Sequence, residues 1–261
     1  MLIHELNAIL AIAYRDFTKL IRDRTRLIAS LIFPIIFIGA LGGSLQANWG
    51  NQTGYNLITF IFTGVMAQVL FQSTAAGVIS LVEDRVNDFS QEMFVSPISR
   101  FSIIIGKIIG ETCVSLIQAV AVILFGLIMG VPLTPWQLLR LAPFLLIVCL
   151  LGGAFGILVL SNLSTERKAN QIFPFVIFPQ FFLAGVFSPI RELPWYLWIL
   201  SRIAPMTYAV DLVRGIFYQG NNQSSLVVLH SPFFNLLIIS MMMVLFATLG
   251  TFIFVRNERN R

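Results

Sequence analysis

The chain has 261 residues, of which 57% are apolar and only 11% are charged. Soluble domains carry roughly 25% charged residues, so this composition excludes an ordinary soluble domain and indicates a protein surrounded by lipid. The net charge is +5. In a membrane protein an excess of basic residues indicates how the chain is oriented in the bilayer, so we expect no nucleic-acid partner.

Residues 1–26 predict an amphipathic helix that lies in the membrane interface. Apolar residues recur at intervals of three and four from Ile3 to Leu20, which places them on one helix face. Three arginines within residues 22–26 close the segment, as is typical of a helix at a membrane surface. A cleaved signal peptide fits less well, because a full-length span follows.

Six charge-poor stretches are long enough to cross a bilayer, which takes about 20 apolar residues. The predicted spans cover residues 27–45, 56–82, 103–129, 138–160, 171–187 and 232–255. We therefore expect an all-α polytopic membrane protein with six transmembrane helices, forming a single membrane domain over residues 1–261.

The distribution of Lys and Arg predicts that both termini are cytoplasmic. Of the 17 basic residues, thirteen lie on the side of the bilayer that holds the two ends. The remaining four, Arg140, Arg191, Arg202 and Arg214, lie on the opposite side. Because basic loops stay in the cytoplasm, we expect a multi-pass protein of the plasma membrane, which in a bacterium is the inner membrane.

A charged segment, residues 83–100, separates the second and third predicted spans. Val86, Phe89 and Met93 are spaced as one helix face, and Pro97 disfavours helix at the residue before it. A helix of this kind can dock its apolar face in a groove of a partner. On spacing alone, an ordinary solvated loop on the membrane is an equal alternative.

Two short helices are predicted within residues 188–220, before the last span. A proline fits the first turn of one helix, a second proline breaks the chain, and Thr207 caps a second helix that stops at Gly220. Both are too short to span, so they predict a re-entrant hairpin, with an external surface cap as the alternative. The residues that define the hairpin are Pro194, Trp195, Trp198, Pro205, Tyr208 and Arg214.

Polar residues within spans are costly and need a reason. Five of them share helix faces in spans two and three: Gln68, Gln72, Lys107, Glu111 and Gln118. Lys107 and Glu111 are four residues apart and can pair. The five residues either line a pathway or join helices through hydrogen bonds.

The sequence contains no recognisable catalytic or metal-binding motif. Gly106 and Lys107 form the only Gly-Lys pair, without the first glycine and the hydroxyl of a phosphate-binding loop. The two cysteines lie in apolar windows and the two histidines are far apart in sequence. We expect no catalytic residue, no metal site and no cofactor bound by this chain.

Two stretches resemble ABC-2 type transporter permeases, the membrane subunits of ATP-binding-cassette exporters. SPISR (residues 96–100), followed by a Gly-Lys, resembles the first cytoplasmic loop of that family, and FFLAGVFSPIRELPWYLWILSRIAPMTYAVDLVRGI (residues 181–216) resembles its later region. The whole layout is similar, closest in style to the drug-resistance branch. Residues 83–90 depart from the family's frequent Glu-Arg-Glu-x-Gly-Thr-Leu-Glu run.

The resemblance implies that the segment after span two is a coupling helix seated in a separate ATP-binding subunit. The implied coupling residues are Glu83, Arg85, Val86, Phe89 and Met93. It also implies that ATP and Mg²⁺ bind to that partner, and that a second permease copy, identical or similar, completes the exporter in lipid. The implied substrate is a drug, lipid or glycolipid.

Two other functions remain open on the sequence. One is a membrane scaffold or assembly protein without transport, and the other is an ion-coupled secondary transporter. The second class usually carries carboxylates near the bilayer midplane. Glu111 is the only carboxylate within a predicted span, near its cytoplasmic edge.

Overall fold

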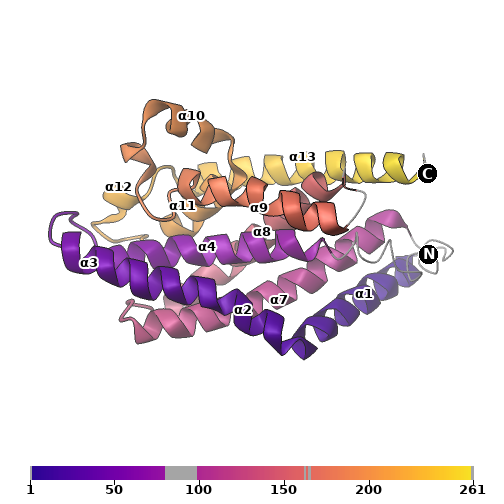
Figure 1. The fold of residues 1–261 in the computed structure, drawn as a ribbon, viewed down its shortest axis with the longest axis horizontal. Helices are drawn as coiled ribbons and strands as arrows, with labels where there is room; N and C mark the ends of the chain where they lie inside the picture. Colours follow the sequence, from indigo (N-terminus) through magenta and orange to yellow (C-terminus); the bar gives the residue numbers. More distant parts are fainter. Residues whose placement is uncertain (1, 80–98, 162, 164–165, 260–261) are drawn as a thin grey trace.

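A computed structural model describes residues 2–79, 99–161, 163 and 166–259, and this part of the chain is all-helical without a strand. In chain order the helices are α1 (Leu2–Arg22), α2 (Arg24–Ile35), the π-helix η1 (Ile36–Gly42), α3 (Gly43–Trp49), α4 (Leu57–Gly77), α7 (Arg100–Ile128), α8 (Pro135–Leu160), α9 (Glu166–Leu183), the 3₁₀ turn η2 (Ile190–Glu192), α10 (Trp195–Ile203), α11 (Pro205–Phe217), α12 (Ser224–Val227) and α13 (Pro232–Arg259). They form an elongated bundle with both termini at one end, and α3, α10 and α12 at the other (Figure 1).

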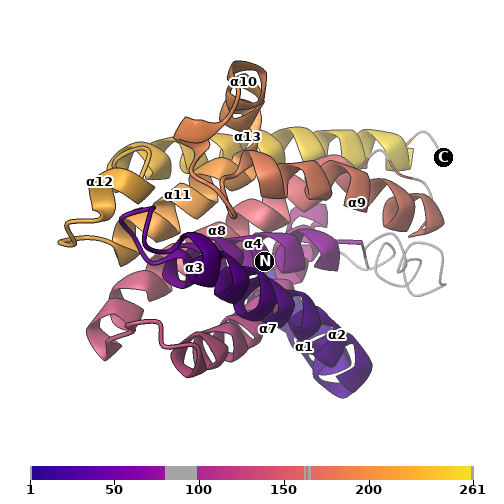
Figure 2. The same cartoon turned by 60° about the vertical axis from the view of Figure 1, so that its left-hand side comes forward.

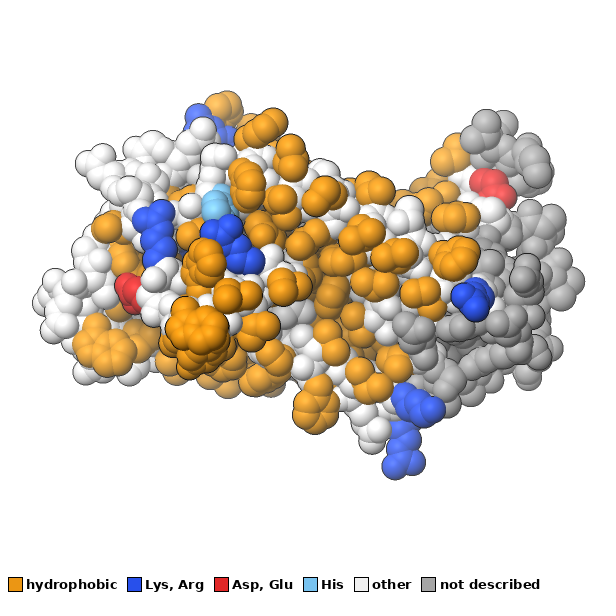
Figure 3. Space-filling model, turned by 90° about the horizontal axis from the view of Figure 1, so that it is seen from above, with side chains coloured by type: hydrophobic (Ala, Val, Ile, Leu, Met, Phe, Trp, Pro, Cys, Tyr) orange, Lys and Arg blue, Asp and Glu red, His pale blue; other side chains and the backbone are white. Residues whose placement is uncertain are grey.

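Five helical segments of the described chain are long and apolar enough to cross a membrane: Ile28–Trp49, Leu57–Gly77, Phe101–Ile128, Pro135–Leu160 and Ser224–Ile253. They correspond to predicted spans one, two, three, four and six. Apolar side chains cover the middle of one face, with Lys and Arg nearer its two ends (Figure 3). This arrangement suits a molecule whose middle part lies in the hydrocarbon core of a bilayer.

The fifth predicted span, residues 171–187, corresponds largely to α9. This helix differs from the other five because it begins with the charged run Glu166, Arg167 and Lys168 and contains two prolines. The structure therefore gives five candidate spans in the described residues, and a sixth crossing stays a prediction.

Pro34 lies inside α2, and the helix passes into the π-helical turn η1 two residues later. Proline lacks an N–H and its ring pushes against the carbonyl four residues earlier. A local change of helical register is a usual way to absorb that disturbance. The first crossing is thus a long helix with an irregular centre, continuing through α3.

Helix α4 is the centre of the bundle, with seventeen of its 21 residues buried. It packs against α7, α8 and α11. On α8, Gly152 and Gly156 lie against the backbone of α4, and a Cβ at Gly156 would come within 2.6 Å of the Ala75 carbonyl oxygen. Small residues four apart allow this close approach of two membrane helices.

Helix α1 packs along the first part of α7. A Cβ at Gly106 would lie 3.0 Å from the carbonyl oxygen of Ile9, and one at Gly110 would lie 3.1 Å from that of Ala13. The opposite face of α1 exposes apolar side chains, among them Leu6 and Leu10. The amphipathic helix therefore has one face on protein, while its place in the membrane interface stays a prediction.

The two helices expected within residues 188–220 exist as α10 and α11, and their environments differ. α10 stands away from the bundle in two views (Figures 1 and 2), whereas every residue of α11 is buried. The prediction that Thr207 caps the second helix is wrong. The N-cap is Ala204, because Pro205 starts the helix earlier, and the Thr207 hydroxyl donates to the Leu183 carbonyl at 3.4 Å.

Candidate functional site

The predicted coupling residues Glu83, Arg85, Val86, Phe89 and Met93 lie outside the described residues. The structure describes the two helices that flank them, α4 and α7. α4 ends and α7 begins toward the end of the bundle that holds both termini (Figure 1). The coupling role of the segment between them stays a prediction.

Three of the five candidate pathway residues gather near a cavity of about 260 Å³ between α2, α4 and α7. Its walls are formed by Ala29, Ser30, Phe33, Pro34, Val69, Gln72, Ser73, Ala76 and Gln118. The α4 members recur at intervals of three and four, so they share one helix face. Of the candidates, Gln72 and Gln118 line the cavity, and Gln68 reaches it through Gln72.

Hydrogen bonds fix the amides of this cavity. Gln118 Nε2 donates to Ser30 Oγ at 3.0 Å, which links α7 to α2. Gln68 Nε2 donates to Gln72 Oε1 at 3.3 Å, and the Gln68 side chain is fully buried. Gln118 therefore both joins two helices and lines the cavity, whereas the bond between Gln68 and Gln72 lies within α4. A role of these residues in a pathway stays a prediction.

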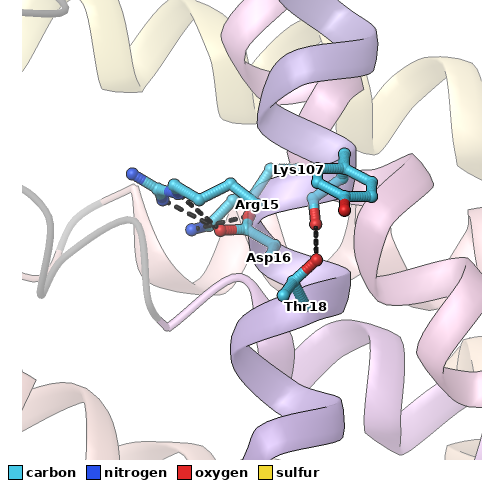
Figure 4. A network of polar contacts seen from close by, with 5 residues as sticks. Arg15, Asp16, Thr18 and Lys107 are labelled. Carbon is cyan, nitrogen blue, oxygen red and sulfur yellow. Dashed lines mark hydrogen bonds and ion pairs between the residues drawn. The ribbon is translucent and has the colours of Figure 1, made fainter.

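Lys107 and Glu111 lie elsewhere, at the contact of α7 with its neighbours. Lys107 Nζ forms a buried ion pair with Asp16 Oδ2 on α1 at 2.9 Å (Figure 4). Arg15 holds the other carboxylate oxygen of Asp16, also at 2.9 Å. The sequence suggested that Lys107 can pair with Glu111, which stays a prediction, and it missed Asp16 because spacing along one helix cannot show a contact with another.

A second polar contact fixes the start of α1 to the start of α7. The Glu5 carboxylate accepts a hydrogen bond from the Ser99 backbone N–H at 3.1 Å. Hydrogen bonds from the Ser102 side chain and from Ser99 lower the pKa of Glu5 below its ordinary value. α1 is therefore held to α7 along its first four turns by polar contacts at both ends of the glycine packing.

At the other end of the bundle, Arg214 of α11 points inward and is only 2% exposed. Its guanidinium donates to the carbonyl oxygens of Phe60 at 3.2 Å and Gly185 at 3.0 Å, and lies 3.7 Å from the centre of the Phe60 ring. Arg214 thus joins α11 to the beginning of α4 and to the turn after α9.

Asp211, one turn before Arg214, was missed by the sequence reasoning. Its carboxylate accepts hydrogen bonds from the backbone N–H groups of Leu229 at 2.7 Å and His230 at 2.8 Å, and from Asn235 Nδ2 at 2.8 Å. One sequence feature could have pointed to Asp211: it lies three residues before Arg214 in an otherwise apolar helix. Charged side chains in such a helix are rarely left without partners. Asp211 fixes α11 to the start of α13.

The remaining hairpin residues fall into an exposed and a buried group. Pro194 is the N-cap of α10, on which Trp195 is 75% exposed and Trp198 lies under the Arg202 guanidinium at 4.3 Å. Pro205 starts α11, and the buried Tyr208 donates its hydroxyl to the Arg202 carbonyl at 2.8 Å. Within the hairpin, the exposed aromatic residues are therefore on α10.

The described residues contain no group of three His, Cys, Asp or Glu side chains placed to hold a metal ion. The features present are apolar helices of membrane length, close glycine packing, and buried charges with partners on other helices. Together they define a multi-pass helical membrane protein.

Residues 7–218 match the family ABC-2 type transporter. Since this match covers most of the chain, the protein belongs to the ABC-2 type transporter family. The resemblance seen in the sequence is confirmed. Membership implies a partner of the ATP-binding-cassette class.

Individual relatives support the same assignment. The chain is 26% identical over 211 residues to the "Putative transport permease ycf38" of Cyanophora paradoxa, covering 78% of this chain and 71% of that protein. It is 27% identical over 180 residues to the "Probable multidrug ABC transporter permease YbhR" of Escherichia coli K12, covering 65% of this chain and 46% of that protein. It is 22% identical over 196 residues to "Nodulation protein J" of Rhizobium meliloti, covering 73% of each. The chain is thus a membrane subunit of a transporter.

Proposed function

We propose that this chain is the permease subunit of an ATP-binding-cassette exporter. It moves a hydrophobic or amphiphilic substrate, a drug, lipid or glycolipid, out of the cytoplasm. ATP and Mg²⁺ are bound by a separate ATPase subunit. The observation that carries this proposal is the family match over residues 7–218. The similarity to a probable multidrug permease supports the substrate class.

The proposal includes six crossings, with α9 as the fifth in chain order. At 1.5 Å per residue, the 18 residues of α9 are about 27 Å long, close to the roughly 30 Å of bilayer hydrocarbon. Its later turns expose Phe175, Phe178 and Phe182, as suits lipid, and its charged first turn suits the headgroup layer. An even number of crossings agrees with termini at one end of the bundle (Figure 1), which we assign to the cytoplasm.

The hairpin of α10 and α11 closes the exit in this proposal. α11 has 13 residues and is about 20 Å long, too short to span, and all of it is buried. Non-spanning backbone at membrane depth requires such burial in protein. The exposed aromatic residues of α10 suit the outer headgroup layer.

Helix α4 offers a mechanical link between the two ends. Its last turn leads into the predicted coupling segment, residues 83–95, and its first turn is held by Arg214 through the Phe60 carbonyl. Movement of the coupling segment by the ATPase would displace a rigid helix whose far end is bonded to α11. The exporter works as a pair of permease copies, and the substrate leaves between them, beneath the hairpins.

Co-expression with an ATP-binding-cassette ATPase tests the proposal. The two subunits should purify together, and reconstituted vesicles should transport a dye or lipid substrate only with ATP. Phe89→Asp should lower transport at least about tenfold, because a charge spoils the predicted docking face at a cost of roughly 1.4 kcal/mol or more. Asn87→Asp adds the same charge off that face and should leave transport near the original rate.

The alternatives predict different results. Unchanged transport by Phe89→Asp at normal expression contradicts the coupling role. Transport driven by a proton gradient without any ATPase indicates a secondary transporter instead. No transport and no bound ATPase would leave the membrane scaffold as the better description.

A further inference from the structure

The cavity between α2, α4 and α7 has an uncharged wall of mixed character. Its polar members are Ser30, Gln72, Ser73 and Gln118, and its apolar members include Phe33. None of the nine lining residues is charged. It is partly open to the surroundings of the bundle, so a molecule can enter it without unfolding a helix.

Three polar groups on this wall have no hydrogen-bond partner among the described residues: the Gln72 amide nitrogen, the Ser73 hydroxyl and the Gln118 amide oxygen. The other half of each amide is held, Gln72 by Gln68 and Gln118 by Ser30. The fully buried Gln68 side chain also has an amide oxygen without a partner. Polar groups of this kind on a partly apolar wall favour an occupant that can hydrogen-bond to them.

The free groups comprise a donor, an acceptor and a hydroxyl that is both. An alcohol or amide on a ligand also donates and accepts, so it can satisfy all three. An anionic or cationic group would enter a partly apolar space without a countercharge among the lining residues, which is costly. The lining therefore selects for uncharged polar groups.

Size limits the occupant to part of a molecule. Pockets that enclose a whole drug-sized ligand measure roughly 300–1,000 Å³, and this cavity is about 260 Å³. It admits a ring or a compact head. The exposed face of α2, with Ile28 and Ile32, offers apolar surface along which an attached chain could lie.

We propose that this cavity is a substrate subsite for the uncharged, hydroxyl- or amide-bearing head of an amphiphile, whose apolar chain lies outside in lipid. This inference rests on the proposed exporter function and adds the chemical class of the head. A bound head contacts α4 at Gln72 and Ser73, within two turns of the helix end at Gly77. It also contacts α2 and α7, so binding braces three helices together.

Photolabelling of the full chain in lipid nanodiscs, without any ATPase, tests the subsite. The probes share one dodecyl chain with a diazirine beside the head, and the heads are the single-ring glucoside, phosphate and trimethylammonium. We expect the glucoside probe to label peptides containing residues 29–34, 69–76 or 118 about fivefold more than either charged probe. Equal labelling by the three probes, or labelling only of other peptides, overturns the proposal.

Variants locate the hydrogen bonds. Gln72→Leu combined with Ser73→Ala should reduce glucoside labelling of these peptides about tenfold, whereas Gln52→Leu, at an exposed glutamine of the loop before α4, should leave it unchanged. Unreduced labelling in the double variant also overturns the proposal. If the double variant folds poorly, the comparison of the three probes on the unmodified chain still tests the proposed subsite.

A separate transport assay distinguishes this inference from the exporter proposal. ATP-driven transport with no labelling of the cavity contradicts the subsite alone. Selective labelling of the cavity in a chain that binds no ATPase supports the subsite and contradicts the exporter.

Discussion

Buried charges fix the bundle at both of its ends, and each is held by side chains or backbone from another helix. Lys107 and Asp16 join α7 to α1 at one end. Arg214 and Asp211 join α11 to α4 and to the start of α13 at the other. A buried charge costs much free energy without a partner, so each of these residues should be sensitive to replacement.

Asp211→Asn should lower the free energy of unfolding by about 2 kcal/mol. The carboxylate accepts three hydrogen bonds, and an amide presents a donor to at least one of those three donors. Thermal unfolding of the detergent-solubilised protein measures the effect. Glu192→Gln, at an exposed carboxylate, is the matched control, and equal losses in the two variants would contradict the assignment.

Lys107→Met should cost about 3 kcal/mol, because it leaves the Asp16 carboxylate buried with only Arg15 beside it. Adding Asp16→Asn should recover part of the loss, since the second change removes the uncompensated charge. Unfolding in a denaturing detergent titration gives both values. If the double variant is less stable than the sum of the single changes predicts, the ion pair does not stabilise the α1–α7 contact.

At the scale of the helices, small residues set the packing. Gly152 and Gly156 on α8 touch α4 backbone, and Gly106 and Gly110 on α7 touch α1. Each pair is four residues apart, so both glycines of a pair lie on one face. α7 and α8 thus each hold a neighbouring helix through an identical spacing.

Gly156→Val should destabilise the protein by at least about 2 kcal/mol, because the added carbons meet the Ala75 carbonyl of α4 rather than a flexible side chain. Gly43→Ala is the matched control. A Cβ at Gly43 meets nothing within 4 Å, and alanine favours helix by roughly 0.5–1 kcal/mol. The thermal unfolding temperature should fall for Gly156→Val and rise slightly for Gly43→Ala. The reverse order would show that α4 and α8 are not closely packed.

Hydropathy predicted most helices well because lipid requires long apolar segments whose backbone bonds internally. Prolines rather than hydropathy indicated α10 and α11, and α12 was not predicted. Hydropathy placed five spans over candidate segments of the structure, the last of which begins earlier than predicted, at Ser224. It did not predict which helices touch, since pairing depends on contacts between distant residues such as Asp16 and Lys107. Among the polar candidates, spacing placed Gln72 beside Gln68 on one helix and Gln118 on a face of another. It could not show that Gln72 and Gln118 line one cavity, because that cavity also needs Ser30 of α2.

For the whole molecule, we propose a chain that crosses the membrane six times and presents both ends to the cytoplasm. This topology depends on α9, which differs from the five other candidates in its charged first turn. With α9 crossing, the two ends lie on one side of the membrane. Without it, they lie on opposite sides.

Labelling of single cysteines in intact cells decides between these arrangements. In a background of Cys113→Ser and Cys149→Ala, a membrane-impermeant maleimide is applied to Asn7→Cys, Asn222→Cys and Arg256→Cys, all at exposed positions. We predict labelling of Asn222→Cys in intact cells, and labelling of the other two only after the membrane is permeabilised. Labelling of Asn7→Cys or Arg256→Cys in intact cells would contradict the account, because a terminus would then face away from the ATPase.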